Sequence, residues 1–193
     1  MIFMQYLTYA CTRASRKISP LAAPSKIPHP PVMRTIKTEP LTAAAFAPFG
    51  DVLEATGDYK LINQGLCLRH HDRAKIDVGS EAGPDARPGI SIFKAAARKL
   101  PYKLTLIERH PDGSQAFLPM TEHPFLVITA AGPDSPPKAF LTNGHQGINL
   151  HRGTWHGVLT PLHEPGLFAV VDRIGPTPNL EEHSYPTPWT ITG

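Results

Sequence analysis

The chain has 193 residues, 41% of them hydrophobic, and only two cysteines, Cys11 and Cys67. This composition indicates one soluble domain with a sizeable core and excludes a disulfide framework or a cysteine-rich metal site, so a reducing cytoplasm is expected. The formal net charge is +3, but four of the 19 basic residues lie within residues 1–32, leaving 15 against 16 acidic residues. Because the remainder is nearly neutral and has no basic stripe, nothing supports nucleic-acid binding.

Residues 1–32 differ in composition from the rest of the chain. They contain no acidic residue, and the apolar stretch 2–10 is too short to span a membrane. Their arginines and serines are typical of an organellar transit peptide, whereas the Pro-rich stretch before Met33 favours a start assigned too far upstream. We favour the second interpretation. We expect an N-terminal extension, disordered or mis-assigned, over 1–32 and one domain over 33–193.

The expected elements from Met33 onward are short strands separated by turns, as 22 prolines and 15 glycines favour. Thr42 can cap a helical turn that ends at Phe46. Strands are predicted at 51–54, 65–71, 90–95, 103–110, 115–119, 125–130, 138–142, 147–151 and 167–172. Such a series predicts an all-β closed barrel or sandwich with a few short helical turns.

Polar residues occupy places on these strands that would face the interior. Glu108 and His110 project to the same side of a strand, while Arg109 projects to the other. A later turn-like stretch brings His151 and His156 close in sequence. The pattern predicts a small site inside the barrel.

The spacing of these residues resembles that of the cupins. In cupins a first motif supplies ligands at i and i+2 and a third four or five residues on, which here are Glu108, His110 and Gln115. A second motif supplies a histidine, matched by His156, with His151 in place of its usual proline. The resemblance implies a double-stranded β-helix barrel and a metal site of Glu108, His110, Gln115 and His156. Because a Gln carbonyl is a weak neutral ligand, a loosely held metal or none is expected.

A longer set of ordered blocks resembles the ureidoglycolate lyase family, from about Met33 to about His183. The blocks are 62–63, 65–66, 69, 71–72, 108–111, 113–120, 140–144, 146–149, 151–152, 155–156 and 172–173. The resemblance implies a cupin-like barrel, usually a homodimer, that splits ureidoglycolate into glyoxylate and urea during allantoin and purine degradation. It also implies a possible divalent metal, nickel or similar.

The substrate's chemistry suggests roles for particular residues. Elimination needs a base for the hydroxyl proton and an acid for the leaving nitrogen, which we expect from His110, His156 and Glu108. The carboxylate needs a cation. Arg69 is our first choice because its planar fork meets a carboxylate in bidentate fashion, and His71, two residues on, is expected to point inward with it.

The remaining expected substrate-binding residues are Gln115, His151 and Trp155. No phosphate loop or Gly-x-Gly-x-x-Gly fingerprint is present, so no organic cofactor is expected. Each histidine could instead be an ordinary hydrogen-bonded core residue. Two other functions stay open at this point: another metal-dependent cupin enzyme, and a non-enzymatic protein that binds a small carboxylate.

Overall fold

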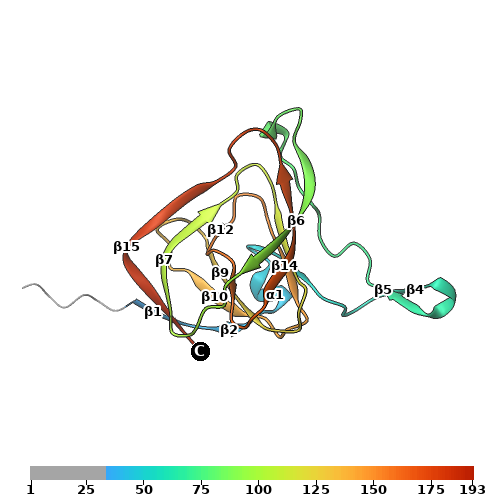
Figure 1. Cartoon of the computed structure of the whole chain (residues 1–193), viewed down its shortest axis with the longest axis horizontal. Helices are drawn as coiled ribbons and strands as arrows, with labels where there is room; N and C mark the ends of the chain where they lie inside the picture. Colours follow the sequence, from blue (N-terminus) through green and yellow to red (C-terminus); the bar gives the residue numbers. More distant parts are fainter. Residues whose placement is uncertain (1–33) are drawn as a thin grey trace, which may run out of the picture. The chain divides into compact units, whose positions relative to one another are not determined.

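A computed structural model describes residues 34–193, and the predicted extension over 1–32 lies outside the described residues. Residues 34–193 fall within one compact unit whose regular secondary structure is mainly strands (Figure 1). The prediction of a mainly β, cupin-like barrel is confirmed. Within the described part of the chain, no helix is long and apolar enough to cross a membrane.

The larger sheet has eight strands in the order β1-β15-β7-β12-β9-β10-β2, with β13 paired to β9. Its strands are β1 (Arg34–Lys37), β2 (Glu39–Pro40), β7 (Tyr102–Arg109), β9 (Phe125–Ala130), β10 (Lys138–Leu141), β12 (Trp155–His156), β13 (Thr160–Pro161) and β15 (Glu181–Thr192). The short strand β12 lies between β7 and β9, so it brings His156 beside the first motif.

The second sheet has five strands in the order β3-β11-β8-β14-β6. They are β3 (Gly50–Leu53), β6 (Arg87–Ala95), β8 (Gln115–Pro119), β11 (Gly147–Leu150) and β14 (Gly166–Ile174). The main apolar core lies between the two sheets, where Phe117 and Val170 of one sheet pack with Phe125, Val127 and Phe140 of the other. A second apolar cluster covers the opposite face of β9 through Leu126 and Ile128. Strand β9 is therefore buried on both faces.

Within residues 34–193, the helical content is limited to α1 (Ala43–Phe46) and the short 3-10 turns η1 (Asn63–Gly65) and η2 (Ser80–Ala82). Thr42 caps α1 as expected, because its Oγ1 accepts a hydrogen bond from Ala45 N at 3.3 Å. Phe46, at the end of this turn, is fully buried in the main core. The turn therefore closes one end of the space between the sheets.

One strand predicted for the barrel lies outside it. In the segment 65–71 only β5 (Cys67–Arg69) is extended, and it pairs with β4 (Lys60–Ile62) in a separate two-stranded sheet. The two strands are joined through positive φ angles at Asn63, Gln64 and Gly65, which reverse the chain. The result is a hairpin that stands off the barrel (Figure 1).

The longest strand, β15, was not predicted. Its sequence contains Pro186 and Pro188, and proline usually argues against a strand interior because it cannot donate a ladder hydrogen bond. The structure places both prolines at an irregularity between Ser184 and Trp189, where the pairing with β7 shifts register. The strand continues on either side of that irregularity.

Candidate active site

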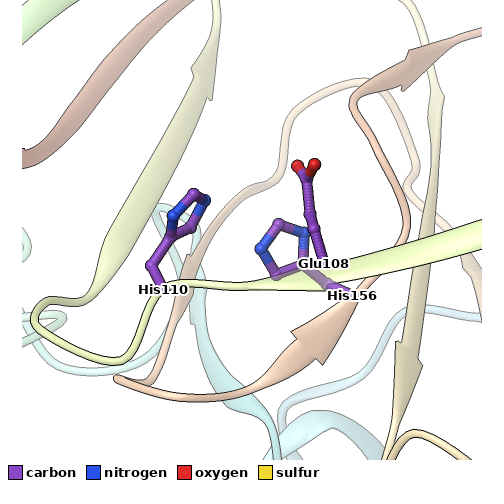
Figure 2. Close-up of side chains that lie close together, drawn as sticks. All are labelled: Glu108, His110 and His156. Carbon is purple, nitrogen blue, oxygen red and sulfur yellow. The ribbon is translucent and has the colours of Figure 1, made fainter. Parts of the chain in front are cut away.

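Glu108, His110 and His156 form a compact cluster. His156 lies opposite Glu108 in the β12–β7 pairing, and His110 follows two residues after Glu108, so all three are placed on one side of the sheet. One potential ligand atom from each lies within 4.8 Å of the others. Figure 2 shows the three side chains close together on neighbouring segments.

The two histidines are oriented in the same way. Nδ1 of His110 lies 2.6 Å from the Asn179 carbonyl, and Nδ1 of His156 lies 3.0 Å from the Gly157 carbonyl. A carbonyl can only accept, so each Nδ1 carries the proton and donates it. Each neutral ring then has a free lone pair on Nε2. Both Nε2 atoms are buried and have no hydrogen-bond partner among the described residues.

Burial controls the protonation of the cluster. It lowers the pKa of His156 to about 4, against a weaker opposing effect of the Gly157 carbonyl and with a further lowering by His110. Burial also raises the pKa of Glu108, which nearby His110 lowers in part and Glu182 raises. His156 is therefore neutral at physiological pH, and Glu108 holds a proton more readily than an ordinary glutamate.

Gln115 also points into the barrel. It alternates with Phe117 of the main core along β8, and its Nε2 donates to Asp172 Oδ2 at 3.2 Å. Asp172 alternates with the core residue Val170 along β14 in the same way. Gln115 Oε1 and Asp172 Oδ1 are buried without a hydrogen-bond partner among the described residues. The interior thus holds several polar atoms in an otherwise apolar space.

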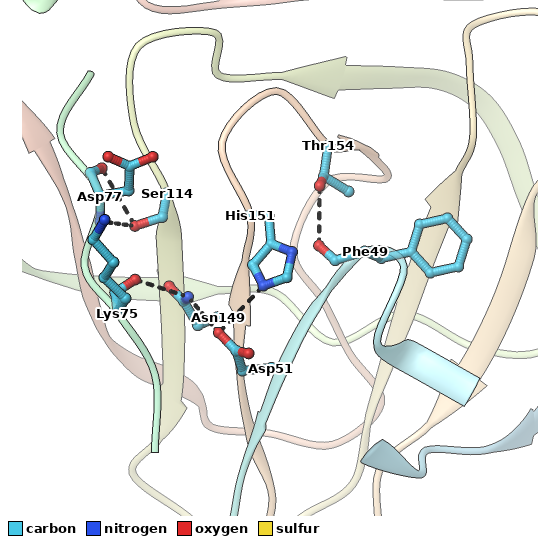
Figure 3. A network of polar contacts seen from close by, with 8 residues as sticks. All are labelled: Phe49, Asp51, Lys75, Asp77, Ser114, Asn149, His151 and Thr154. Carbon is cyan, nitrogen blue, oxygen red and sulfur yellow. Dashed lines mark hydrogen bonds and ion pairs between the residues drawn. The ribbon is translucent and has the colours of Figure 1, made fainter. Parts of the chain in front are cut away.

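His151 and Trp155 lie apart from this cluster. Nε2 of His151 is 3.4 Å from Asp51 Oδ2, in a polar network drawn in Figure 3. Trp155 precedes His156 on β12 and so faces the opposite side of the sheet, where the Arg109 guanidinium lies 4.9 Å from its ring centroid. Both line a hollow on the barrel surface together with Thr154. The structure does not bring them to Glu108, His110 and His156.

Arg69 and His71 are also separate from the cluster, and the prediction that they point inward together is wrong. Both are exposed and line a shallow hollow with other residues of the hairpin, Asp58, Tyr59 and Lys60. The physical reason is that β5 pairs with β4 and not with a barrel strand. Alternation along a strand determines which side chains share a face, but it does not determine which part of the protein that face packs against.

The comparison with known proteins agrees with this geometry. The family model described as ureidoglycolate lyase matches residues 33–192. This chain belongs to the ureidoglycolate lyase family. A relative from Rhodobacter capsulatus named ureidoglycolate lyase is 53% identical over 165 residues, covering 83% of this chain and 100% of the relative. One from Chelativorans sp. with the same name is 50% identical over 163 residues, covering 82% and 97% of the two chains. One from Burkholderia mallei is 47% identical over 164 residues, covering 83% and 95%.

The cluster in this member of the ureidoglycolate lyase family fits a divalent metal. Two imidazoles offer Nε2 atoms that have no hydrogen-bond partner among the described residues, Glu108 offers a carboxylate, and all three are near one another. Their Nδ1–H groups are held by backbone carbonyls, an arrangement that commonly orients metal-binding histidines. The buried Oε1 of Gln115 is a further oxygen donor on the facing sheet. These are the four residues that the cupin resemblance implies as ligands.

Sequence reasoning did not identify two features of this site. The first is Thr129, which is fully buried opposite His156 and whose hydroxyl has no hydrogen-bond partner among the described residues. The sequence signal for it was a polar residue within the buried strand Phe125–Ala130. The carbonyl of Asn179, which holds His110, had no detectable signal because 69 residues separate the partners. Backbone carbonyls are present at every position and so leave no mark in the sequence.

Proposed function

We propose that this protein is a ureidoglycolate lyase that cleaves ureidoglycolate to glyoxylate and urea, a carbon–nitrogen lyase of the amidine-lyase type. The observation that carries the proposal is the convergence of Glu108, His110 and His156 inside the barrel of a chain of this family. Buried acid–base groups within reach of one another are what an elimination with two proton transfers requires. The family comparison gives no support to the two alternatives, another metal-dependent cupin enzyme and a non-enzymatic protein that binds a small carboxylate.

The reaction moves one proton off the substrate and one onto it. A base takes the hydroxyl proton, the oxygen's electrons form the carbonyl of glyoxylate, and the carbon–nitrogen bond breaks as the leaving nitrogen gains a proton to give urea. When the site holds no metal, we assign the base to Nε2 of His110, because burial lowers the pKa of His156 to about 4 and makes the lone pair of His156 weakly basic. Glu108, whose pKa burial raises, is suited to donate to the leaving nitrogen.

The same residues would hold a divalent metal, nickel or a similar ion. Glu108, His110, Gln115 and His156 would be its ligands, and the low proton affinity of His156 favours this role because a ligand must be unprotonated. When bound, such a metal would supply positive charge that eases deprotonation of a hydroxyl group. We propose that the metal is held loosely, because a glutamine carbonyl is a weak ligand.

Metal content tests this part of the proposal. Purified protein would be dialysed to equilibrium against excess nickel chloride, and bound metal per chain would be determined from the difference in nickel between the two sides of the membrane, without removing free metal. We expect near-stoichiometric nickel in the wild type and a large loss in His110→Ala. The matched control is His145→Ala, because His145 is exposed in a loop outside the cluster. Equal metal in both variants would contradict the proposed ligand set.

The activity itself is tested with racemic ureidoglycolate. We expect glyoxylate and urea to appear together in equal amounts, each measured by its own assay. Release of ammonia instead of urea would mean hydrolysis of the ureido group, which is a different reaction. Binding of the substrate without any product would contradict the enzymatic proposal and favour the binding protein.

The proposal also covers the oligomeric state of the protein and its location in the cell. We propose a homodimer that works in the cytoplasm in allantoin and purine catabolism, with Arg69 and His71 contributing to the binding of the substrate carboxylate. Arg69 is suited to this because a guanidinium meets a carboxylate through two parallel hydrogen bonds. We also propose that Gln115, His151 and Trp155 contribute to substrate binding and that residues 1–32 are dispensable for it.

A further inference from the structure

The turn between β7 and β8, residues 110–114, carries His110 and is held by other segments of the chain. We call it the corner. The His110 carbonyl accepts a hydrogen bond from Gly153 N at 2.9 Å, and the Asp112 carbonyl accepts one from Gly79 N at 2.9 Å. Both bonds join backbone atoms only. They fix the position of the corner, but they do not determine how the His110 ring is oriented.

Asn179 bonds both the His110 ring and the backbone of the corner. Its carbonyl accepts from Nδ1 of His110 at 2.6 Å, and its side-chain Oδ1 accepts from Asp112 N at 2.8 Å. The side-chain bond fixes where the carbonyl lies relative to the corner, so the two bonds together hold the ring. The ring of His156, in contrast, bonds the carbonyl of Gly157, the next residue along the chain.

Asn179 belongs to the segment 175–180, which joins β14 to β15 and has no regular secondary structure. We call it the connecting segment. Five of its six residues are exposed, so apolar burial contributes little to holding it in place. Pro176 and Pro178 fix their own φ angles and restrict the residue before each of them. The sequence of the connecting segment therefore limits the conformations available to the Asn179 carbonyl.

Arg173 anchors the connecting segment to the barrel. Its side chain is buried, and it donates to the carbonyls of Thr177 and Ala82, each at 2.6 Å, and to the Thr177 hydroxyl. Such bonds are costly to break, because a buried charge without partners is strongly unfavourable. Arg173 also packs on the corner, since a Cβ at Gly113 would lie 2.7 Å from the Arg173 Cβ. One buried arginine thus contacts both the connecting segment and the corner.

The orientation of the His110 ring decides what it offers to the site. A neutral imidazole has one N–H donor and one nitrogen lone pair, and the two can exchange places between tautomers. With Nδ1–H held by Asn179, the lone pair is on Nε2, which is buried without a hydrogen-bond partner among the described residues. The centroids of the His110 and His156 rings are 5.4 Å apart, and Glu108 lies beside them (Figure 2). In the other tautomer Nε2 would carry a proton and could accept none.

We propose that Asn179 is a positioning residue for His110. Its carbonyl and its side-chain oxygen together hold the ring as the Nδ1–H tautomer with the Nε2 lone pair in the site, and Arg173 anchors the segment that carries Asn179. The inference rests on the proposed function for the role of His110 as the base. The tautomer and the orientation of the ring do not depend on that role.

The tautomer of His110 in metal-free protein tests the proposal without an activity assay. Protein with nitrogen-15-labelled histidine is kept in chelator at alkaline pH, where imidazole rings are neutral. Long-range proton–nitrogen correlation spectra then show which ring nitrogen carries the proton. The His110→Gln variant identifies the signals of His110 among those of the ten histidines.

We expect Nδ1–H alone in the wild type and a mixture of both tautomers in Asn179→Ala. Asn179→Asp keeps an acceptor oxygen for Asp112 N and should restore Nδ1–H. The matched control is Asn143→Ala, because Asn143 Oδ1 likewise accepts from a backbone amide, His145 N at 2.9 Å, in the loop between β10 and β11. This control should leave His110 unchanged. A wild-type tautomer in Asn179→Ala, or Nε2–H in the wild type, would overturn the proposal.

Kinetics distinguish positioning of His110 from a merely structural role. Asn179→Ala should lower kcat by about ten- to a hundredfold with little change in KM, because the misplaced base acts in the transition state and Asn179 itself does not bind the substrate. Asn179→Asp should recover most of this loss. In the His110→Gln background, Asn179→Ala should have little further effect, since it acts through His110. Equal losses in the two backgrounds would overturn the proposal. If the wild type leaves ureidoglycolate intact while the tautomer responds as expected, the proposed reaction is wrong and the positioning of His110 stands.

Discussion

The barrel interior and the hairpin of β4 and β5, residues 58–71, which we call the arm, are incomplete in opposite ways. Inside the barrel, polar atoms such as Nε2 of His110 and His156 are buried without partners, although a buried polar group without a hydrogen bond costs free energy. On the arm, apolar side chains such as Leu66 and Leu68 are exposed, although burial would stabilise them. In each region of the described structure, side-chain groups therefore lack the contacts that would stabilise them.

The difference shows how stability and function are distributed in this protein. The main core around Phe125 and Phe140 supplies apolar burial and lets the barrel tolerate a few unpartnered polar atoms. Those atoms are then available to a substrate or a metal. The arm adds little apolar burial to its own chain, because most of its large apolar side chains are exposed. The predictions below remove one of these features at a time.

The largest expected effect is on Glu108. Glu108→Gln keeps the shape of the side chain but removes the acid, so the fold should persist while kcat falls by roughly 10²- to 10⁴-fold, the usual contribution of a general acid or base. Steady-state release of glyoxylate measures it. Glu39→Gln is the matched control, because Glu39 is an exposed glutamate on β2 that does not contribute to the pKa shift of Glu108. A similar loss in both variants would contradict a specific role for Glu108.

The second prediction concerns pH and the stability of metal-free protein. The folded-state pKa of His156 is about 4, below its ordinary value of 6.5, so between these values the unfolded chain binds a proton that the folded chain does not. Its contribution to stability is therefore complete above pH 6.5 and is lost as pH falls toward 4. The total change is about 3 kcal/mol, since one pKa unit corresponds to roughly 1.4 kcal/mol.

Urea unfolding between pH 7 and pH 5, with chelator present, measures this dependence. His156→Gln is the comparison, because it lacks the titrating group and leaves the other carboxyl groups in place. The raised pKa of Glu108 acts with the opposite sign in both proteins, so the difference between their pH slopes isolates His156. Parallel slopes would show that His156 is not held neutral by burial.

The fold and part of the site followed from local sequence patterns. Strand alternation is a local property, so it placed Glu108 and His110 on one side, and the second motif added His156 from a strand that aligns opposite Glu108. The Thr42 cap was likewise readable because it depends on residues three apart. In each case the signal and the structure involve neighbouring positions.

The position of Arg69 did not follow from the sequence. Cys67-Leu68-Arg69 alternates in the same way whether it pairs with a barrel strand or with Lys60–Ile62, and the partner is a non-local choice. Strand β15 was not predicted for a different reason. Its sequence contains Pro186 and Pro188, which lie at the irregularity in its pairing with β7.

The third prediction is that Arg69→Lys keeps the fold and loses roughly ten- to a hundredfold in kcat/KM, which corresponds to about 1.5–3 kcal/mol for a charged hydrogen bond. A lysine keeps the charge but not the planar fork that orients the carboxylate. Arg98→Lys is the control, since Arg98 is exposed on the barrel. Unchanged kcat/KM in Arg69→Lys would remove Arg69 as the carboxylate clamp and direct attention to Arg109, Arg152 or Arg173.

The smallest expected effect is that of removing residues 1–32. The family match begins at residue 33, and the relative from Rhodobacter capsulatus aligns over its whole length with 83% of this chain. The barrel, its core and the Glu108 cluster all lie within residues 34–193. A protein that starts at Met33 should therefore unfold at the same temperature as the full chain and release glyoxylate at the same rate. Thermal unfolding and steady-state assays on the two proteins, side by side, measure this. A lower unfolding temperature in the shorter protein would show that residues 1–32 pack on the barrel, and a lower rate alone would show that they contribute to catalysis.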